Sequence, residues 1–453
     1  MIDAAKPAVL GGEALVAEGL LTRWPTLTED DKAAVARVLE RGVLSGPFAP
    51  ESVAFEQEFA SFVGAKFAFV THSGTSALHL ACAGAGVGPG DEVIVPAYSF
   101  VATPMSVLHQ QAIPVFVDIE EETGCLDPTL IEAAITPRTK AIMPVHMHGT
   151  AADLAPILEL AARRGLVVLE DAAQAHGARW NDRPVGAIGA AGGFSMQSSK
   201  NLSVGEGGIF VTNDEAVAAT ANRWRNFGED IRPSDFAYDR TRPLDAARAY
   251  ESVTVGFMYR GQEMTSALGR SRLARLAADT ARAQAHHERL VDGLSDLPGL
   301  ILPTVPAGRT SVFHKYRIRL DATAAGVADK LPDDQPTALR DCLIEALAAD
   351  GIEAVLWQSK PLPAAGLFRN REGYGGGHPW SLHDQDVWPS YQPEQFPVTQ
   401  RLLDHSFCLF SQSHPLIAQE APAVEAYIAG IRRVWEHLPA VVDRWVASHV
   451  AHS

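Results

Sequence analysis

Long runs of aliphatic residues recur through the first 280 residues and are separated by stretches with helical spacing. The aliphatic runs are typical of strands buried on both faces of a sheet; they are FAFVTH, DEVIVPAY, PVFVDI, KAIMPVHM and LVVLEDAA, followed by the shorter GGFSM and GGIFVTND. The stretches between them predict helices; they include SGTSALHLACAGAG, VATPMSVLHQQ, PTLIEAAI and LAPILELAARRG. Strands that alternate with helices predict an α/β domain in which helices flank a mostly parallel central sheet.

Two helices are expected before the first strand. Residues 28–41 begin with a Thr/Asp cap and continue with apolar positions at helical spacing. The sequence GVLSGPFAP then predicts a loop, because its glycines and prolines interrupt a helix, and a second helix is expected from Ser52 towards Phe62. We assign these residues to the large domain as its N-terminal arm.

The pattern changes after residue 300. FHKYRIRLD alternates like an antiparallel strand, ALRDCLIEALAADG predicts a helix, IEAVLW predicts a strand, and residues 419–446 are expected to be helical. A long helix over 264–294 is expected to connect the two parts. We therefore predict a large α/β domain over 1–280 and a small α+β domain over 281–453. Residues 229–252 and 361–396 lack a clear period and predict a long loop and an irregular covering segment.

The composition is that of a globular protein that handles small molecules. Of 453 residues, 47% are apolar and 20% charged, which excludes a mainly disordered chain. The net charge of −16 disfavours a nucleic-acid partner, because such partners usually meet a basic surface. Without a basic leader or a run of 18 apolar residues, we expect no membrane partner and a cytoplasmic location. The four cysteines lie far apart and form no CxxC motif, so we expect no metal site.

Two segments carry candidate binding groups. The sequence Ser73-Gly74-Thr75-Ser76 lies between a predicted strand and a predicted helix. Backbone N–H groups at a helix start bind anions, although a plain helix cap explains the same residues. Asp171 follows the aliphatic run LVVLE. Ligands bind at the carboxyl edge of open parallel sheets, so this carboxylate is expected to face a ligand, with a helix N-cap as the alternative.

Lys200 is the third candidate. It stands in a turn rich in hydroxyl groups and glycines, between two predicted strands, and its neighbours are uncharged. A lysine becomes a nucleophile when desolvation or nearby cations lower its pKa; the alternative is an ordinary surface lysine. The three candidates occur in the order that pyridoxal 5'-phosphate requires. A helix start for the phosphate comes first, then a carboxylate at a strand end, and then a lysine after a further strand.

Five longer motifs extend this pattern: GPFAPESVAFEQEFASFVGAKFAFVTHSGTSALHL, GDEVIVPAYSFVAT, PVHMHGTAADL, EDAAQAHGA and FSMQSSKNLSVGEGGIFVTND. Together they resemble one family, the DegT/DnrJ/EryC1/StrS aminotransferases. The resemblance runs from about residue 42 to 285. It implies the aspartate-aminotransferase fold (fold type I), pyridoxal 5'-phosphate as cofactor, and amination of a sugar or cyclitol ketone in two half-reactions, which predicts ping-pong kinetics.

The resemblance also implies roles for single residues. Lys200 matches the lysine that bonds the cofactor covalently and moves protons. Asp171 matches the partner of the pyridine nitrogen, and Gln174 the residue that hydrogen-bonds the phenolic oxygen. Phe100 matches the aromatic ring that stacks on the pyridine, although a core position is the rival interpretation.

Further matches concern the cofactor phosphate. Gly74, Thr75 and Ser195 match phosphate binders, and Ser76 occupies a position that is often alanine. GFMYRGQEMTSALG matches the segment that reaches a neighbouring subunit's cofactor phosphate. Met258 stands where the family often has asparagine and cannot donate a hydrogen bond, whereas Arg260 can. The resemblance therefore implies a homodimer with active sites at the interface.

The histidines in the matched motifs predict no metal centre. VHMHG contains His146 and His148 two residues apart, but no third ligand cluster accompanies them. We expect His146 to be a structural histidine with its hydrogen bonds satisfied. His176 lies close in sequence to Asp171 and Gln174 and is expected to support them.

The implied partners are a small amino donor, L-glutamine or L-glutamate, and a keto acceptor. Gln197, three residues before the lysine in SMQSSK, resembles the branch that acts on cyclitol ketones such as scyllo-inosose. A nucleotide-linked keto sugar is the alternative acceptor. A dehydratase using the same cofactor fits less well, because Lys200 is present and the cysteines are scattered. A non-enzymatic regulator that binds the cofactor also fits less well, because Lys200 and Asp171 are both present.

Overall fold

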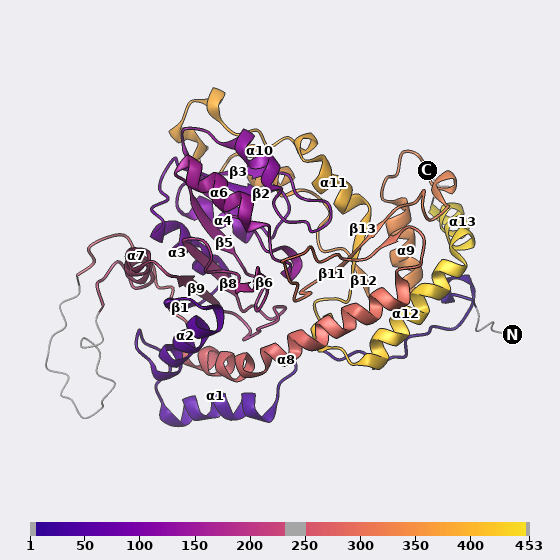
Figure 1. Cartoon of the computed structure of the whole chain (residues 1–453), viewed down its shortest axis with the longest axis horizontal. Coiled ribbons are helices and arrows are strands. Elements are labelled where there is room, and N and C mark those ends of the chain that lie inside the picture. The colour runs from indigo at the N-terminus through magenta and orange to yellow at the C-terminus, as the bar shows by residue number, and fades with distance from the viewer. Residues whose placement is uncertain (1–5, 232–250, 450–453) are drawn as a thin grey trace.

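The chain folds around two sheets that a long helix, α8 (Glu263–Leu294), connects as predicted. The computed structural model describes residues 6–231 and 251–449, so most of the predicted loop at 229–252 lies outside the described residues. Figure 1 shows the larger sheet among α3, α4 and α6 and the smaller one beside α9, with α8 running from one part to the other. The two sheets thus leave a junction at which residues from both can meet.

The larger sheet has seven strands in the order β1-β9-β8-β5-β4-β2-β3. Only β9 runs against its neighbours, so the predicted mostly parallel sheet is confirmed. The strands are β1 (Phe67–Thr71), β2 (Glu92–Pro96), β3 (Ile113–Val117), β4 (Thr139–Ile142), β5 (Val167–Asp171), β8 (Ala191–Ser195) and β9 (Gly208–Thr212). A separate two-stranded hairpin joins β6 (Arg179–Trp180) to β7 (Arg183–Pro184).

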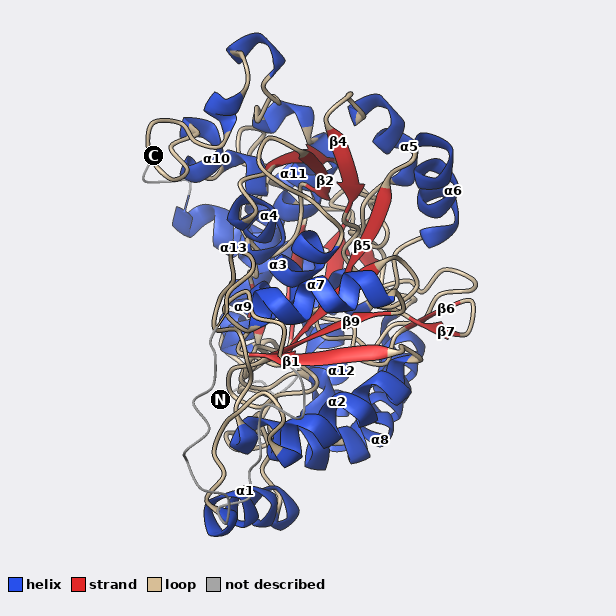
Figure 2. Ribbon diagram, turned by 90° about the vertical axis from the view of Figure 1, so that its left-hand side faces the viewer, coloured by secondary structure: helices blue, strands red, loops and turns tan. Residues whose placement is uncertain are grey.

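Helices cover both faces of this sheet, which explains its uninterrupted aliphatic strands (Figure 2). In β2, Val93 and Val95 pack in the same cluster as α3, α4 and α7, whereas Ile94 packs in the cluster of α6. Each such buried side chain contributes about 1.5–3 kcal/mol. The helices are α3 (Gly74–Gly84), α4 (Ala102–His109), α5 (Pro128–Ile131), α6 (Leu154–Arg164) and α7 (Glu215–Arg225).

The two N-terminal helices form as predicted. Helix α1 (Glu29–Arg41) begins with a capping box in which Thr28 and Asp31 exchange hydrogen bonds between side chain and backbone. Helix α2 (Pro50–Val63) buries Phe55 and Phe59 against the large sheet. Both helices also pack on α8.

The smaller sheet is antiparallel, with the order β10-β11-β13-β12. Its strands are β10 (Leu300–Ile301), β11 (Tyr316–Leu320), β12 (Ala354–Val355) and β13 (Ser406–Leu409). The helices after residue 300 are α9 (Ala338–Ala349), α10 (Gly366–Asn370), α11 (Pro397–Asp404), α12 (Ala421–Glu436) and α13 (Leu438–His449). The strand predicted from IEAVLW is shorter than expected, because β12 is an edge strand that leaves the sheet before Trp357.

Residues 362–396 return to the large sheet. Phe368, Trp380, Tyr391 and Phe396 are buried in the cluster that contains Phe116 of β3. The Tyr391 hydroxyl donates to the Pro114 carbonyl at 2.7 Å and accepts from the Trp380 indole at 2.8 Å. The aromatic segment is therefore packed as a cover over one end of the large sheet.

In the part of the chain that the structure describes, no helix is both long and apolar enough to cross a membrane.

Candidate active site

A cavity of about 410 Å³ lies where the carboxyl ends of the parallel strands meet residues from beyond α8. Asp171 and Ser195 are the last residues of β5 and β8, and Phe100 follows β2. Most of the predicted site residues line this cavity: Gly74, Thr75, Phe100, Asp171, Gln174, Ser195 and Lys200. Ser76 and Arg260 do not line it.

Lys200 stands in the turn that follows β8. Its backbone N–H donates to the Gln197 carbonyl at 2.8 Å, and the Gln197 side chain accepts from the backbone and hydroxyl of Ser199, each at 2.8 Å. Desolvation lowers the pKa of Lys200 to about 8, with a further decrease from the Lys315 charge and an opposing effect of Asp171. Roughly a tenth of the amine is therefore neutral, and nucleophilic, at pH 7, far more than for a lysine with the ordinary pKa.

Asp171 is buried at the floor of the cavity, and both of its carboxylate oxygens accept hydrogen bonds. The Thr103 hydroxyl donates to Oδ2 at 2.6 Å, and the Ala173 backbone N–H donates to Oδ1 at 3.1 Å. Burial raises the pKa of Asp171, while these two bonds and the Lys200 charge oppose that rise. The carboxylate is thus held in one orientation, facing the cavity.

The start of α3 forms a close-packed cradle against β8. A Cβ on Gly74 would lie 2.6 Å from the Ser195 Cβ, so only glycine fits there. The Ser73 hydroxyl caps the helix by accepting from the Ser76 N–H at 3.1 Å. The N–H groups at the first positions of a helix have no partner within the helix, and here the first two residues, Gly74 and Thr75, line the cavity. The arrangement suits a bound anion.

Ser76 belongs to the cap rather than to the cavity. Its hydroxyl contacts the Ser73 hydroxyl at 2.7 Å and the His72 ring at 3.0 Å. Arg260 lies further away, where its guanidinium donates to the Asn226 side chain at 3.0 Å and its backbone bridges to Thr71.

Phe100 and Gln174 occupy the cavity wall. The Phe100 side chain is 55% exposed, although it belongs to a motif that is otherwise buried, so the structure does not make it a core residue. The Gln174 oxygen accepts from the His148 backbone N–H at 3.0 Å, which fixes that end of the amide.

His146 and His176 have different surroundings. Both ring nitrogens of His146 are hydrogen-bonded, one to Glu170 and one to the Ala152 N–H, each at 3.0 Å. His176 is buried between Phe59 and Phe194, and neither of its ring nitrogens has a hydrogen-bond partner among the described residues. Burial lowers the pKa of His176 to about 3, so its ring is neutral. Within residues 6–231 and 251–449, no group of three His, Cys, Asp or Glu side chains is arranged to hold a metal ion.

Several lining residues were not predicted from the sequence. Glu206 lies in the glycine-rich turn beyond Lys200, and His314, Trp357 and Gln412 come from the segments around the small sheet. Thr103 does not line the cavity but supports Asp171 from behind. It stands one helical turn after Phe100, in the AYSFVAT motif, and that spacing is a signal that could have identified it. No comparable signal exists for the small-sheet residues, because only the tertiary fold brings them to the cavity.

Comparison with known proteins agrees with this arrangement. The family model described as "DegT/DnrJ/EryC1/StrS aminotransferase family" matches residues 25–394. The chain belongs to this family. Its expected aminotransferase class is thereby confirmed, since curated relatives and structural neighbours are named as aminotransferases of the DegT/DnrJ/EryC1/StrS family. The aminotransferases of this fold type I class use pyridoxal phosphate.

Two relatives of the DegT/DnrJ/EryC1/StrS chain differ in their named substrates. A Streptoalloteichus tenebrarius protein, whose assigned activity is that of an L-glutamine:3-amino-2,3-dideoxy-scyllo-inosose aminotransferase, is 35% identical over 92% of this chain and 95% of its own length. The dTDP-3-amino-3,4,6-trideoxy-alpha-D-glucose transaminase of Streptomyces venezuelae is 39% identical over 67% and 75%. The solved structure of S. venezuelae DesV in complex with a ketimine intermediate superposes with a TM-score of 0.72 and 31% identity, covering 91% of this chain and 99% of DesV.

Proposed function

We propose that this chain uses pyridoxal phosphate to transfer an amino group from L-glutamine or L-glutamate to a ketone of a cyclitol or free sugar. The observation that carries the proposal is one cavity that joins a lysine of lowered pKa, a buried carboxylate and a glycine-lined helix start. These are the three groups that the cofactor needs: an amine to bond it, an anion beside its ring nitrogen, and donors for its phosphate.

The cofactor, when bound, supplies an electron sink for the carbon that loses its proton. Lys200 would bond the cofactor covalently, and its amine would move the proton at the donor's α-carbon as base and as acid. Asp171 holds the ring nitrogen in its protonated form. Gly74, Thr75 and Ser195 bind the phosphate, while Phe100 packs on the ring and Gln174 hydrogen-bonds the phenolic oxygen.

The lining of the cavity supports an uncharged acceptor. Lys200 is the only lysine or arginine among the described lining residues, and Glu206 adds a carboxylate to the wall. A nucleotide-linked sugar carries a diphosphate, which proteins bind with arginine or lysine. A cyclitol instead needs neutral polar groups, such as Gln197 and Gln412, and an apolar wall such as Trp357. The near full-length match to the S. tenebrarius relative, whose name contains an L-glutamine donor and a scyllo-inosose, supports the same acceptor class.

A nucleotide-linked keto sugar is the second candidate acceptor. It is favoured by the higher identity, 39%, to a relative named as a dTDP-sugar transaminase. A dehydratase or a regulator has less support, because the described cavity holds both Lys200 and Asp171.

We also propose a homodimer in which Arg260 reaches the cofactor phosphate of the neighbouring subunit. Three large apolar side chains close to Arg260 in sequence are strongly exposed, namely Val253, Val255 and Met258. Burial of such side chains against a second copy would remove apolar surface from water.

We also propose that the chain divides into two domains near residue 280, within α8. The two separate sheets support this division.

The acceptor assignment is tested by competition. The protein with bound cofactor is supplied with L-glutamine and equal amounts of scyllo-inosose and a dTDP-linked keto sugar. The products are identified by mass spectrometry. The proposal expects the mass of an aminocyclitol as the main product. Amination of the dTDP sugar alone would establish the second candidate instead, and loss of water without amination would establish a dehydratase.

A further inference from the structure

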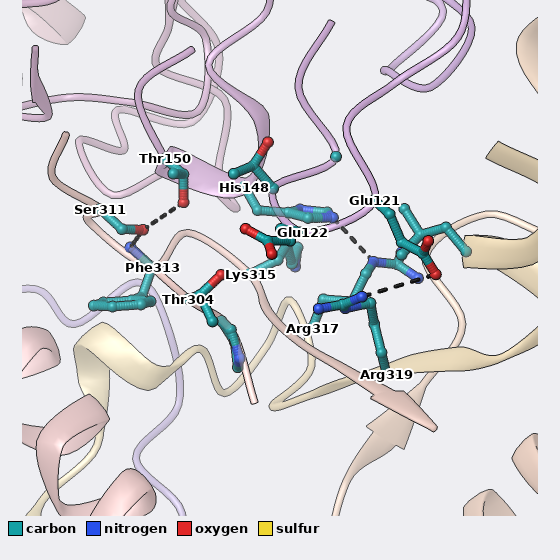
Figure 3. Close-up of a pocket in the computed structure, with 14 residues that line it drawn as sticks. Glu121, Glu122, His148, Thr150, Thr304, Ser311, Phe313, Lys315, Arg317 and Arg319 are labelled. Carbon is teal, nitrogen blue, oxygen red and sulfur yellow. Dashed lines mark hydrogen bonds and ion pairs between the residues drawn. The ribbon is translucent and has the colours of Figure 1, made fainter. Parts of the chain in front are cut away.

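Figure 3 shows a second, smaller cavity, whose lining residues differ from those of the active-site cavity. Its volume is about 30 Å³, and its lining includes His148, Phe313, Lys315 and Arg317. Phe313 precedes His314, which lines the active-site cavity, and the His148 N–H donates to Gln174, which also lines it. The segments that line the small cavity therefore also contact the wall of the active site. A water molecule needs at least about 10–15 Å³ measured in this way, so the space admits a single small ion.

The cavity contains two buried cations that have no counter-ion among the residues that the structure describes. Lys315 and Arg317 are 5% and 8% exposed, respectively. The Lys315 ammonium forms no hydrogen bond or ion pair with any of the described residues, 6–231 and 251–449. Arg317 donates to the His148 ring at 3.2 Å and to the Ser406 hydroxyl at 2.5 Å, but its remaining Nη2 has no acceptor within the described chain.

An unpaired buried charge is unfavourable, because the protein interior does not replace its hydration. Burial accordingly lowers the pKa of Lys315. Arg317 does not have this alternative, since a guanidinium stays charged in proteins. The pair therefore forms a site that an anion would stabilise in its charged form.

The carboxylates nearby do not supply that anion. Glu121 already pairs with Arg401 at 2.9 Å and lies 3.8 Å from Arg319. Glu122 also lines the cavity, but it is exposed and makes no ion pair with a described residue. Figure 3 shows both glutamates on a different segment from Lys315 and Arg317.

The wall between the two cavities has a fixed shape. His148 and Phe313 both adopt left-handed backbone conformations, with φ of 55° and 47°. Such conformations persist only where packing and hydrogen bonds hold them. The Phe313 N–H donates to the Ser311 hydroxyl at 3.2 Å, and the Thr150 hydroxyl donates to the same oxygen at 3.0 Å. The cavity is thus built into the fold rather than being a gap between mobile side chains.

We propose that this cavity binds a small monovalent anion of halide size between the Lys315 ammonium and the Arg317 guanidinium. The anion pairs two buried cations and satisfies Nη2 of Arg317. It also offsets the positive charge that Lys315 presents to Lys200 across the wall, so the site couples a bound ion to the electrostatics of the active-site cavity. The inference depends on the second cavity alone and is independent of the proposed acceptor and cofactor.

The probe is chloride, measured through the thermal stability of the full chain. Unfolding is followed in potassium chloride and in potassium gluconate at equal ionic strength, because gluconate is too large for the cavity. The proposal expects Tm to rise with chloride in a saturable manner, by roughly 2 °C near saturation. Lys315→Met should abolish this chloride dependence, whereas Lys140→Met, at an exposed position outside both cavities, should retain it. Identical Tm values in the two salts would overturn the proposal.

A direct measurement covers the case in which the Lys315 variant does not fold. A crystal of the wild-type protein grown in bromide should show an anomalous peak between Lys315 and Arg317. Ordered bromide elsewhere with none at this position would reject the site.

Discussion

The Thr103 hydroxyl donates a 2.6 Å hydrogen bond to the carboxylate of Asp171, and so joins α4 to the end of β5 at the floor of the cavity. The Ser99 hydroxyl lies 2.7 Å from Thr103 Oγ1 and completes a short chain of polar groups. Because all three residues are buried, the bond acts in a medium of low dielectric constant. Thr103 thus opposes the rise in the pKa of Asp171 that burial causes.

Thr103→Val should reduce kcat by roughly tenfold, equivalent to about 1.4 kcal/mol. Loss of the bond raises the pKa of Asp171 further, so the carboxylate becomes protonated at a higher pH and the acid limb of the pH–rate profile moves upwards. Thr103→Ser keeps the hydroxyl and should behave like the wild type. A lower kcat with an unshifted acid limb would mean that Thr103 acts only through packing.

The rate at which the apoprotein incorporates pyridoxal phosphate should depend on the charge of Lys200. Only the neutral amine attacks an aldehyde. The rate should therefore increase with pH and reach half its maximum at about pH 8. Lys315→Met removes a nearby positive charge, which raises the pKa of Lys200 and moves that midpoint upwards. Absorbance stopped-flow measurements across pH provide the profile, with Lys140→Met as the control. A midpoint that is the same in both variants would exclude coupling between Lys315 and Lys200.

Gly74→Ala should weaken cofactor binding. Its new Cβ would meet Ser195 at 2.6 Å, so the start of α3 must shift and its N–H groups no longer converge on the phosphate. We expect a loss of affinity of about tenfold or more, measured by fluorescence titration. Gly88→Ala is the matched control, because its nearest neighbouring atom, in the Asp91 carboxylate, is 4.0 Å away. Unchanged affinity in Gly74→Ala would remove the phosphate from this position.

The proposed dimer predicts complementation between two inactive variants. Lys200→Ala lacks the catalytic amine, and Arg260→Ala lacks the phosphate contact that we propose to cross the interface. In a mixed dimer, one site contains both wild-type residues, so an equimolar mixture should recover about a quarter of wild-type activity. Activity is assayed after co-refolding, and sedimentation confirms the assembly. If the mixture stays inactive although mixed dimers form, Arg260 does not act across the interface.

Local chemistry explains which features could be predicted from the sequence. The cap of α1 is contained within four residues, Thr28 to Asp31, and its capping box forms as the sequence indicates. The strands of the large sheet are buried on both faces, so their unbroken aliphatic runs are a strong signal. Asp171 and Lys200 could be placed near each other because Asp171 ends one strand of the sheet and Lys200 follows another.

The remainder depends on contacts distant in sequence. Trp357 and Gln412 reach the active-site cavity only because the small sheet packs beside the large one. Aromatic residues of the segment 362–396 pack on β3, although more than 240 residues separate them, and no periodicity encodes that choice. Ser76 matches a site position in sequence, yet its hydroxyl contacts Ser73 and His72 instead of the cavity. These two partners lie at the helix cap, within four residues of Ser76.

The central claim is that this cavity removes an amino group from a donor before it meets a ketone. The most direct measurement is the visible absorption spectrum of the protein with bound cofactor, mixed with L-glutamine or L-glutamate and no acceptor. Our account predicts that the yellow absorption is lost with at least one donor, that the keto acid is released in an amount equal to the sites, and that Lys200→Ala shows neither change. A spectrum that persists with both donors, in protein that demonstrably holds the cofactor, would contradict it.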